Sequence, residues 1–459
     1  MFPWFAMGHL TPYLHLSNKL AKRGHKISFF IPKNTQTKLE QFNLFPNLIT
    51  FYPINVPHIE GLPLGAETTS DIPFSLGSLL MTAMDQTQDQ IEHLLIHLNP
   101  HIIFYDFTFW LPKLTRSLGI KSCIYFIISP ATISYTTSPA RMSQGSNLTH
   151  LDLMQPPKGY PVSCIKFQVH EAKHLASRRN FKFGSDVLFN DRVYTCLSLS
   201  DAIIFKGCKE IEGPYVEYLE DQFKKPVLLS GPVIPEKPNT VLEEKWAAWL
   251  GGFKDSSVIY LALGSECKLQ QGQFNELLLG LELTGFPFLA VLKPPIGFET
   301  IEDALPEGFK ERVEGRGIVH SGWMQQQLIL EHKSVGCFVT HCGAGSITEG
   351  LVNNCQLVLL PQLNGDQIIN ARMMGGKLKV GVEVKKGEEN GLFTKESVCE
   401  AVKTVMDDEN EVGREVRINH TKLRNLLLRP DLESASVDDF SDKLKDLVRS
   451  KNGEKNHKT

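Results

Sequence analysis

The stretch WMQQQLILEHKSVGCFVTHCGAGSITEG, residues 323–350, decides the predicted fold. Residues 335–340 within it are an apolar run of strand length, which leads through a glycine turn into a helical stretch. Gly343 and Gly345 permit a tight turn with close backbone approach, and Ser346 is expected to cap the helix. The unpaired N–H groups and positive dipole end at a helix start favour phosphate. This order of elements predicts an α/β sheet with a phosphate site at its edge.

His341 and Glu349 are the candidate ligand-binding side chains of this stretch. His341 ends the predicted strand, where open α/β sheets hold their ligands, and is expected to donate to a phosphate oxygen. Glu349 lies one turn into the helix, in place to accept hydrogen bonds from ribose hydroxyls. The stretch has neither the lysine of a P-loop nor the pattern G-x-G-x-x-G, which disfavours an ATPase or a dinucleotide site. A glycine turn after a strand can also be purely structural.

Short apolar runs and amphipathic stretches alternate along the rest of the chain. In the second half, strands are expected at residues 258–264, 288–293, 317–320, 335–340 and 357–360, and helices at 271–283 and 325–331. In the first half, strands are expected at residues 26–31, 102–105 and 122–128, and helices at 10–23, 79–98 and 110–118. This alternation is typical of βαβ units on a parallel sheet.

The chain length predicts two such domains, because 459 residues exceed what one hydrophobic core fills. The proline-rich GPVIPEKPNT, residues 231–240, is interpreted as the linker between them. We therefore expect doubly wound domains at residues 1–235 and 236–430, with ligand bound between them. Residues 431–459 are expected to form a helix that packs back on the first domain and ends in a frayed polar tail, SKNGEKNHKT.

Composition disfavours several classes of protein. The formal net charge is −3, whereas a nucleic-acid-binding protein would carry a basic surplus. The nine cysteines include no C-x-x-C pair and indicate reduced thiols in a cytoplasmic protein rather than a disulfide framework. No apolar stretch approaches the length that spans a bilayer, so we expect no integral membrane segment. We expect the protein to act as a monomer.

The apolar N-terminus, FPWFAMGHL, is short and has no basic residues before it, so it is not expected to be a signal sequence. We interpret it as the end of a first strand that runs into a turn at Gly8. Because few residues precede that turn, the sequence is expected to begin inside a slightly longer protein.

Residues 323–367 resemble a donor-binding signature, the plant secondary product glycosyltransferase box of family 1 glycosyltransferases. The matching positions are spread over the whole box: Trp323, Gln326, His341, Cys342, Gly343, Ser346, Glu349, Pro361, Asp366 and Gln367. The resemblance implies a GT-B fold, in which two Rossmann-like domains face a central cleft, and a UDP-sugar as donor. In the family the tryptophan stacks on uracil, the first glutamine and the glutamate contact ribose, the histidine and serine bind the diphosphate, and the final Asp–Gln pair holds sugar hydroxyls. The same roles are expected here at Trp323, at Gln326 and Glu349, at His341 and Ser346, and at Asp366 and Gln367, with Gly343 and Gly345 shaping the turn.

Two departures from the family pattern bear on the donor sugar. Ala344–Gly345 replaces the usual Trp–Asn pair, and PQLNGDQ is one residue longer than in common members. Both changes lie near the sugar, and we expect UDP-glucose as donor, with UDP-xylose and UDP-rhamnose as alternatives. Ser265, in LALGSECK, matches a family turn that faces the diphosphate, although a serine after glycine also forms plain turns.

Sugar transfer with inversion needs a base for the proton of the acceptor hydroxyl, and histidine suits neutral pH. His9 lies in a G-H-x-x-P arrangement, which matches the family's first loop and its catalytic histidine. Asp106 ends the apolar run IIFYD at the same sheet edge and is expected to bond His9 and fix its tautomer. Taken alone, either residue would more often be an ordinary cap. The histidines are scattered and no D-x-D stretch occurs, so no metal is expected.

The resemblance covers nearly the whole chain and extends to the acceptor. FPWFAMGHLTP, VPHIEGLPLGAETTSD and HCGAGS look like a plant branch that extends the sugar of flavonoid or anthocyanin glycosides. This implies a flavonol or anthocyanin 3-O-glycoside as acceptor and a disaccharide as product. Triterpenoid glycosides or an aglycone are alternative acceptors. The candidate acceptor walls are aromatic residues, which beside strands more often belong to the core: Trp4, Phe5, Phe107 and Trp110.

Three other classes fit the residues less well. A non-catalytic nucleotide-sugar-binding protein would keep residues 323–367 without His9 and Asp106. A UDP-sugar epimerase shares the two-domain plan but needs no aromatic acceptor loops. A membrane-bound detoxifying transferase would carry a signal peptide and a C-terminal span. The sequence therefore predicts a cytoplasmic, inverting, metal-independent UDP-glycosyltransferase.

Overall fold

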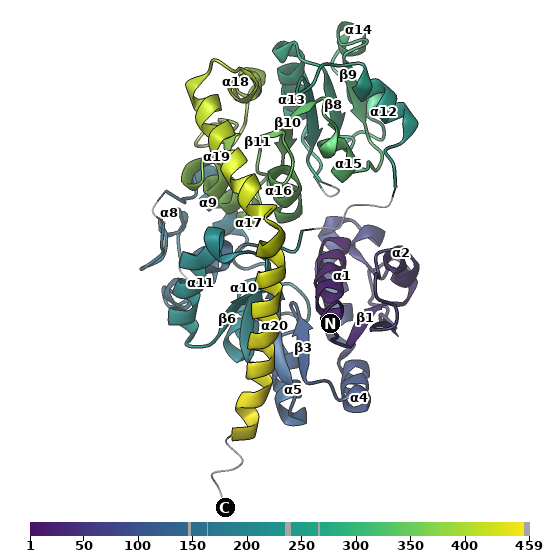
Figure 1. The fold of residues 1–459 in the computed structure, drawn as a ribbon, viewed down its shortest axis with the longest axis vertical. Helices are drawn as coiled ribbons and strands as arrows, with labels where there is room; N and C mark the ends of the chain where they lie inside the picture. The colour runs from purple at the N-terminus through teal and green to yellow at the C-terminus, as the bar shows by residue number, and fades with distance from the viewer. Residues whose placement is uncertain (146–147, 163, 235–239, 265–266, 454–459) are drawn as a thin grey trace, which may run out of the picture.

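The computed structural model describes residues 1–145, 148–162, 164–234, 240–264 and 267–453. Two α/β halves stack along the long axis of the molecule, and the last helix, α20 (Pro430–Gly453), runs along the N-terminal half (Figure 1). The tail expected from residue 450 therefore starts later, because α20 continues to Gly453. Residues 454–459, and residues 235–239 of the expected linker, lie outside the described residues.

The first half carries two groups of parallel strands. β1 (Ile27–Pro32) pairs with β2 (Ile49–Ile54), and a second sheet has the order β3-β4-β5-β6. Its strands are β3 (Ile102–Tyr105), β4 (Lys121–Phe126), β5 (Ala202–Phe205) and β6 (Val227–Leu229). The helices are α1 (Met7–Ala21), α2 (Gln36–Glu40), α3 (Gly77–Asp85), α4 (Gln88–Leu98), α5 (Leu111–Leu118), α6 (Pro130–Thr136), α7 (Pro139–Met142), α8 (His150–Met154), α9 (Val169–Ser177), α10 (Phe189–Leu199) and α11 (Lys209–Phe223). Short 3-10 turns occur at Lys33–Thr35, Thr69–Asp71 and Phe74–Leu76.

The second half is built on one six-stranded parallel sheet with the order β12-β11-β10-β7-β8-β9. Its strands are β7 (Val258–Ala262), β8 (Phe288–Val291), β9 (Gly317–His320), β10 (Val335–Thr340), β11 (Gln356–Leu359) and β12 (Gly381–Glu383). Its helices are α12 (Glu244–Gly251), α13 (Gln271–Thr284), α14 (Phe309–Arg312), α15 (Gln326–Glu331), α16 (Ala344–Leu351), α17 (Gly365–Arg372), α18 (Lys395–Met406) and α19 (Glu411–Leu427). A short 3-10 helix at Glu302–Ala304 and a π-helical segment at Met373–Lys377 complete the second half.

The strands of the four-stranded sheet and those of the six-stranded sheet both turn their carboxyl ends toward the junction of the halves. β7 and β10 are buried at every residue, as expected for parallel strands with helices on both faces. The segments that follow β4, β5 and β10 line one common cavity. The two halves therefore meet at this cavity, with segments that follow strands of both halves on its walls.

The N-terminal segment does not form the strand that the sequence predicts. Phe2 makes only an isolated parallel bridge to Tyr105, although its N–H bonds to Phe104 and Met1 accepts from Phe30. The segment thus lies between β1 and β3, but Pro3 has no N–H to continue a ladder. The predicted turn at Gly8 is also wrong, because α1 begins at Met7 and Gly8 is its second residue.

The expected helix over residues 79–98 is two helices, α3 and α4, separated at Gln86–Thr87. The hydroxyl of Thr87 donates to the carbonyl of Met84 at 2.7 Å, a side-chain bond that competes with the helical ladder. The other expected strands and helices occur, with ends displaced by a few residues, as is usual for boundaries read from sequence.

Helix α20 is attached to the first half by packing and by ion pairs. Phe440 packs edge-on against Phe104 of β3, with ring centroids 6.2 Å apart. Lys19 of α1 donates to Glu433 at 2.9 Å, and Glu433 also accepts the Ile234 N–H at 2.8 Å. Helix α20 therefore covers part of the surface of the first half.

No helix among the described residues is long and apolar enough to cross a membrane. All nine cysteines lie within the described residues and are free thiols.

Candidate active site

The carboxyl end of β10 passes directly into α16 at the cleft. Cys342 adopts a left-handed conformation with φ of 68°, which turns the chain after His341. Gly343 occupies the N-cap position of α16, so the expectation that Ser346 caps this helix is wrong. The helix begins immediately after the turn, and Ser346 is its third residue. The N–H groups at this helix start still face the cleft region as a potential anion site.

The imidazole of His341 is packed against two glycines. A side-chain carbon on Gly264, whose φ is +80°, would lie 3.0 Å from the ring, and one on Gly343 would lie 2.6 Å from Nε2. Burial lowers the pKa of His341, and a hydrogen bond to the backbone of Ala262 partly offsets this. Its Nδ1 is buried without a partner in the structure, and buried polar atoms are normally paired. The other ring nitrogen, Nε2, faces Gly343 at the start of α16.

Gln326 of α15 meets Ser346 and Glu349, which lie one turn apart on α16. The Gln326 amide donates to Glu349 Oε2 at 2.6 Å and approaches Ser346 Oγ at 3.4 Å. Burial raises the pKa of Glu349, and hydrogen bonds from Gln326 and Gln327 and the charge of Lys206 partly offset this rise. Three hydrogen-bonding groups thus converge at the position predicted for ribose and diphosphate.

Trp323 presents its indole to solvent, with 82% of the residue exposed. Large aromatic side chains bury much of their surface in folded proteins, so an indole this open is available to stack on a planar ligand. It lies three positions before Gln326, at the start of the segment that leads into α15. This is the arrangement expected for a base-stacking residue next to the ribose group.

Asp366 and Gln367 are the second and third residues of α17. Gln367 Oε1 accepts the backbone N–H of Gln362 at 3.2 Å, which closes the loop before the helix. Exclusion of water raises the pKa of Asp366 to about 6, while backbone N–H bonds of Gln367 and Asp366 and the charge of His9 lower it in part. His9 belongs to the first half, so the two halves bring these groups within electrostatic reach across the cleft.

His9 and Asp106 form a hydrogen-bonded pair on the first half. His9 Nδ1 lies 3.0 Å from Asp106 Oδ2, and the same oxygen accepts the Trp4 N–H at 2.8 Å. The Asp106 side chain is 3% exposed and that of His9 is 22% exposed. A buried carboxylate thus holds one ring nitrogen of a histidine whose other side remains accessible.

An aromatic cluster lies beside this pair. Phe107 is 5.7 Å from the His9 ring, and Phe183 contacts both Trp4 and Phe107, at 5.4 and 5.6 Å between centroids. Phe189 completes the cluster. Phe5 has no exposed surface and Trp4 is 5% exposed, so these two support the wall from behind, whereas Phe107 and Trp110 are half-buried.

Phe183 and Phe189 were missed by sequence reasoning. They flank a tight reversal at residues 183–187, where the N–H of Phe183 bonds to Val187 and that of Val187 bonds to Gly184. The segment has no strand or helix periodicity. The recurrence of phenylalanine at positions 181, 183 and 189 was the only available signal.

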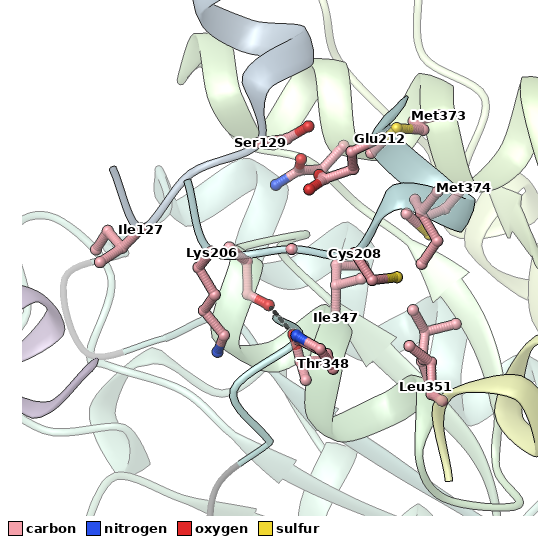
Figure 2. Close-up of a pocket in the computed structure, with 16 residues that line it drawn as sticks. Ile127, Ser129, Lys206, Cys208, Glu212, Ile347, Thr348, Leu351, Met373 and Met374 are labelled. Carbon is pink, nitrogen blue, oxygen red and sulfur yellow. Dashed lines mark hydrogen bonds between the residues drawn. The ribbon is translucent and has the colours of Figure 1, made fainter. Parts of the chain in front are cut away.

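A cavity of about 80 Å³ lies between the halves, behind α16 (Figure 2). Ser129, Lys206 and Glu212 line it from the first half, and Ile347 and Thr348 line it from α16. Burial raises the pKa of Glu212 to about 8 and lowers that of Lys206 to about 8, in each case with partial compensation from neighbouring groups. Sequence reasoning did not single out these buried polar groups.

The predicted site residues therefore form two groups. One group lies on the second half: Trp323, Gln326, His341, Gly343, Gly345, Ser346, Glu349, Asp366 and Gln367. The other lies on the first half: His9 and Asp106, with Trp4, Phe5, Phe107 and Trp110 around them. Ser265 lies outside the described residues. The described part of the chain contains no group of three or more His, Cys, Asp or Glu side chains with metal-binding geometry.

The chain is similar in sequence to known glycosyltransferases. Residues 307–422 match the family model described as UDP-glucoronosyl and UDP-glucosyl transferase. The chain is 64% identical over 448 residues to a cyanidin 3-O-galactoside 2''-O-xylosyltransferase of Actinidia chinensis var. chinensis, with 98% of both chains covered. It is 57% identical to an anthocyanidin 3-O-glucoside 2''-O-glucosyltransferase of Ipomoea nil, over 98% of this chain and 97% of that protein.

Solved structures share the fold at much lower sequence identity. A UDP-glucose: anthocyanidin 3-O-glucosyltransferase in complex with UDP superposes with a TM-score of 0.78 at 22% identity, covering 98% of each chain. Glycyrrhiza uralensis UGT73P12, complexed with glycyrrhetinic acid 3-O-monoglucuronide, superposes with a TM-score of 0.80 at 20% identity, covering 99% of this chain and 96% of that one. The predicted architecture of two Rossmann-like domains is confirmed by this likeness.

Proposed function

The chain belongs to the family of UDP-glucoronosyl and UDP-glucosyl transferases, and on that premise we propose that it extends the sugar of a flavonoid 3-O-glycoside. The predictions of a plant family 1 glycosyltransferase, of the GT-B fold and of a UDP-sugar-dependent enzyme are confirmed by this membership. What remains to be proposed is the role of each residue, the acceptor and the transferred sugar.

The observation that carries the proposed chemistry is the pair of His9 and Asp106 opposite Asp366. With Nδ1–H of His9 donating to Asp106, Nε2 is the basic nitrogen and accepts the proton of the acceptor hydroxyl. The acceptor oxygen, which loses this proton, attacks the anomeric carbon of the donor sugar. The bond from that carbon to the UDP oxygen breaks, UDP leaves, and the configuration at the anomeric carbon inverts. Asp106 stabilises the imidazolium that forms.

The donor is proposed to bind across β10, α15, α16 and α17. Trp323 stacks on uracil, Gln326 and Glu349 bond the ribose, and Asp366 with Gln367 holds the sugar hydroxyls. His341, Ser346 and the N–H groups at the start of α16 receive the charge that develops on the leaving diphosphate. Because these groups supply the stabilisation, the proposed reaction proceeds without a metal ion.

The acceptor is proposed to bind against the aromatic cluster of the first half. Phe107 and Phe183 are half-buried, and Phe107 adjoins His9, so a flat aglycone stacked on them would bring its attached sugar to the base. Relatives at 64% and 57% identity are named as a cyanidin 3-O-galactoside 2''-O-xylosyltransferase and an anthocyanidin 3-O-glucoside 2''-O-glucosyltransferase. We propose the same hydroxyl here, with glucose or xylose as the transferred sugar.

Further proposals concern organisation and location. The limits of the acceptor-binding and donor-binding domains are proposed at residues 1–235 and 236–430. Nine free thiols are typical of a reducing compartment, which supports a cytoplasmic reaction. The enzyme is proposed to act as a monomer.

The proposed function is tested by incubating the protein with cyanidin 3-O-galactoside, cyanidin 3-O-glucoside and a flavonol 3-O-glucoside, each with UDP-glucose, UDP-xylose and UDP-rhamnose. Mass spectrometry then reports a gain of a hexose, a pentose or a deoxyhexose, and NMR of the product gives the linkage. The expected result is a 2''-linked disaccharide from UDP-glucose or UDP-xylose. Glycosylation of an aglycone or of a triterpenoid glycoside alone would contradict the proposed acceptor.

A further inference from the structure

Helix α17 carries the two predicted sugar-binding residues at its start and an ion pair to the other half of the molecule at its end. Asp366 and Gln367 lie in its first turn, and Arg372 is its last residue. Arg372 Nη2 donates to both carboxylate oxygens of Glu171, at 2.8 and 3.0 Å. Glu171 belongs to α9 of the first half, so this ion pair spans the junction.

The ion pair of Glu171 and Arg372 is largely buried, and further hydrogen bonds fix the geometry of both side chains. The Glu171 side chain is 2% exposed and that of Arg372 is 12% exposed. Glu171 also accepts the backbone N–H of Gln168 at 2.7 Å, which ties it to the start of its own helix. Arg372 donates in addition to Glu383 of β12, and the attraction of both carboxylates raises its pKa despite burial. A planar guanidinium held by two carboxylates has little rotational freedom.

The opposite end of α17 is held by the same helix of the first half. Leu175 of α9 lies beside Gly365, where an added methyl group would meet it at 3.6 Å. Lys386 donates to the carbonyl of Pro361, at the base of the loop that leads into α17. Helix α9 therefore lies beside α17 near Gly365 and pairs with it at Arg372.

A further contact extends this connection. His170 Nδ1 is 2.9 Å from the carbonyl of Glu388, and the His170 backbone N–H bonds to the same carbonyl. The loop after β12 is thus fixed to α9 as well. None of these groups contacts Trp323, Gln326, His341 or Glu349 through any hydrogen bond described here.

We propose that Glu171 and Arg372 are positioning residues, which hold Asp366 and Gln367 at the correct distance and angle from His9 on the other half. The inference rests on the proposed function of the site. It implies that the ion pair acts on the placement of the donor sugar, whereas the affinity for UDP itself is set by α15, α16 and β10. Small displacements of a reacting group are costly, since about 1 Å can lower a rate about 100-fold.

The test compares transfer with nucleotide binding in the full-length protein. Arg372→Gln and Glu171→Gln are each expected to lower kcat with the best donor by about tenfold or more, and to change the Kd for UDP by less than about twofold. The double variant is expected to resemble either single variant, because both changes break the same pair. Arg372→Lys keeps the positive charge but not the planar guanidinium, which donates to Glu171 and Glu383 at once. It is expected to recover only part of kcat.

Arg312→Gln is the matched control. Arg312 pairs with Glu282 through Nε and Nη2, at 2.6 and 3.0 Å, on a more exposed surface, and neither residue is assigned to the site. It is expected to leave both kcat and the UDP Kd unchanged. If a glutamine variant does not fold, Arg372→Lys and Glu171→Asp, which keep both charges, give the same comparison.

Two results would overturn the inference. One is a rate unchanged in Arg372→Gln, and the other is a loss of UDP affinity in parallel with kcat, which would indicate general loosening of the site. Failure of the proposed function is distinguishable, because the unaltered protein would then transfer no sugar from any UDP-sugar.

Discussion

His9 Nδ1 lies 3.0 Å from Asp106 Oδ2, and that oxygen is held in turn by the Trp4 N–H at 2.8 Å. In Asp106→Asn the shape is kept while the charge that stabilises an imidazolium is removed. We expect kcat to fall about 100-fold to 10,000-fold. The measurement is the initial rate with both substrates saturating, with the UDP Kd as control. An unchanged kcat would show that the carboxylate has no part in proton transfer.

Replacing His9 itself removes the proposed base. His9→Ala is expected to abolish transfer while the Kd for UDP stays within about twofold, because the nucleotide contacts lie on the other half. Product formation is followed by chromatography, and UDP binding by calorimetry. Full turnover by this variant with saturating donor would eliminate the assignment.

Trp323 is expected to matter for the nucleotide and little for the fold. Since 82% of this residue is exposed, Trp323→Ala should change the free energy of unfolding by no more than about 0.5 kcal/mol. Loss of a base–aromatic stack should raise the UDP Kd about 5-fold to 150-fold. Trp323→Phe keeps a ring and should recover much of the affinity. Calorimetric titration with UDP gives both values, and an unaltered Kd in the alanine variant would place the uracil elsewhere.

The raised pKa of Asp366, about 6, predicts a pH effect on binding of the donor sugar. Only the ionised carboxyl accepts hydrogen bonds from two hydroxyls, so the Kd for the UDP-sugar should rise as pH falls below 6. Asp366→Asn should lose this rise, and the comparison of the two proteins with the same UDP-sugar isolates the effect of this carboxyl. Binding of the UDP-sugar to both proteins is measured between pH 5 and 7.5.

The same shift has a defined sign for stability. A carboxyl whose folded pKa lies above its ordinary value of 3.8 contributes stability that is present below that value and is lost as pH rises through about 6. The thermal unfolding midpoint of Asp366→Asn should therefore exceed that of the unaltered protein most clearly above pH 6. An equal difference at pH 4 and pH 7.5 would contradict the raised pKa.

Metal independence is tested by chelation. The proposed leaving-group contacts are His341, Ser346 and the start of α16, so excess EDTA is expected to leave the transfer rate unchanged. A large loss that added Mg²⁺ or Mn²⁺ restores would require a different mechanism of diphosphate stabilisation.

Local patterns predicted the second half well because its predicted site residues lie close together in the sequence, within residues 323–367. The strand at residues 335–340 occurs at those residues, and the turn at His341 leads into the expected helix. The cap was misassigned to Ser346 because glycine and serine both suit a helix start, and only the backbone angles decide between them. The convergence of Gln326 with Glu349 followed from the family resemblance rather than from periodicity.

The remaining features depend on contacts between distant segments. Phe183 reaches Trp4 through a reversal at residues 183–187 that has no regular period. Glu171 and Arg372 are separated by 201 positions, and nothing in either local sequence marks them as partners. Buried ion pairs of this kind are determined by how helices pack, which a single sequence does not state.

The attachment of α20 to β3 has a consequence for the order in which the protein is made on the ribosome. Phe104 emerges early during translation, but Phe440, which covers it, is synthesised only after the whole second half. Until then an apolar surface of the nascent first half has no cover. The half that is translated first is consequently the half that is completed last.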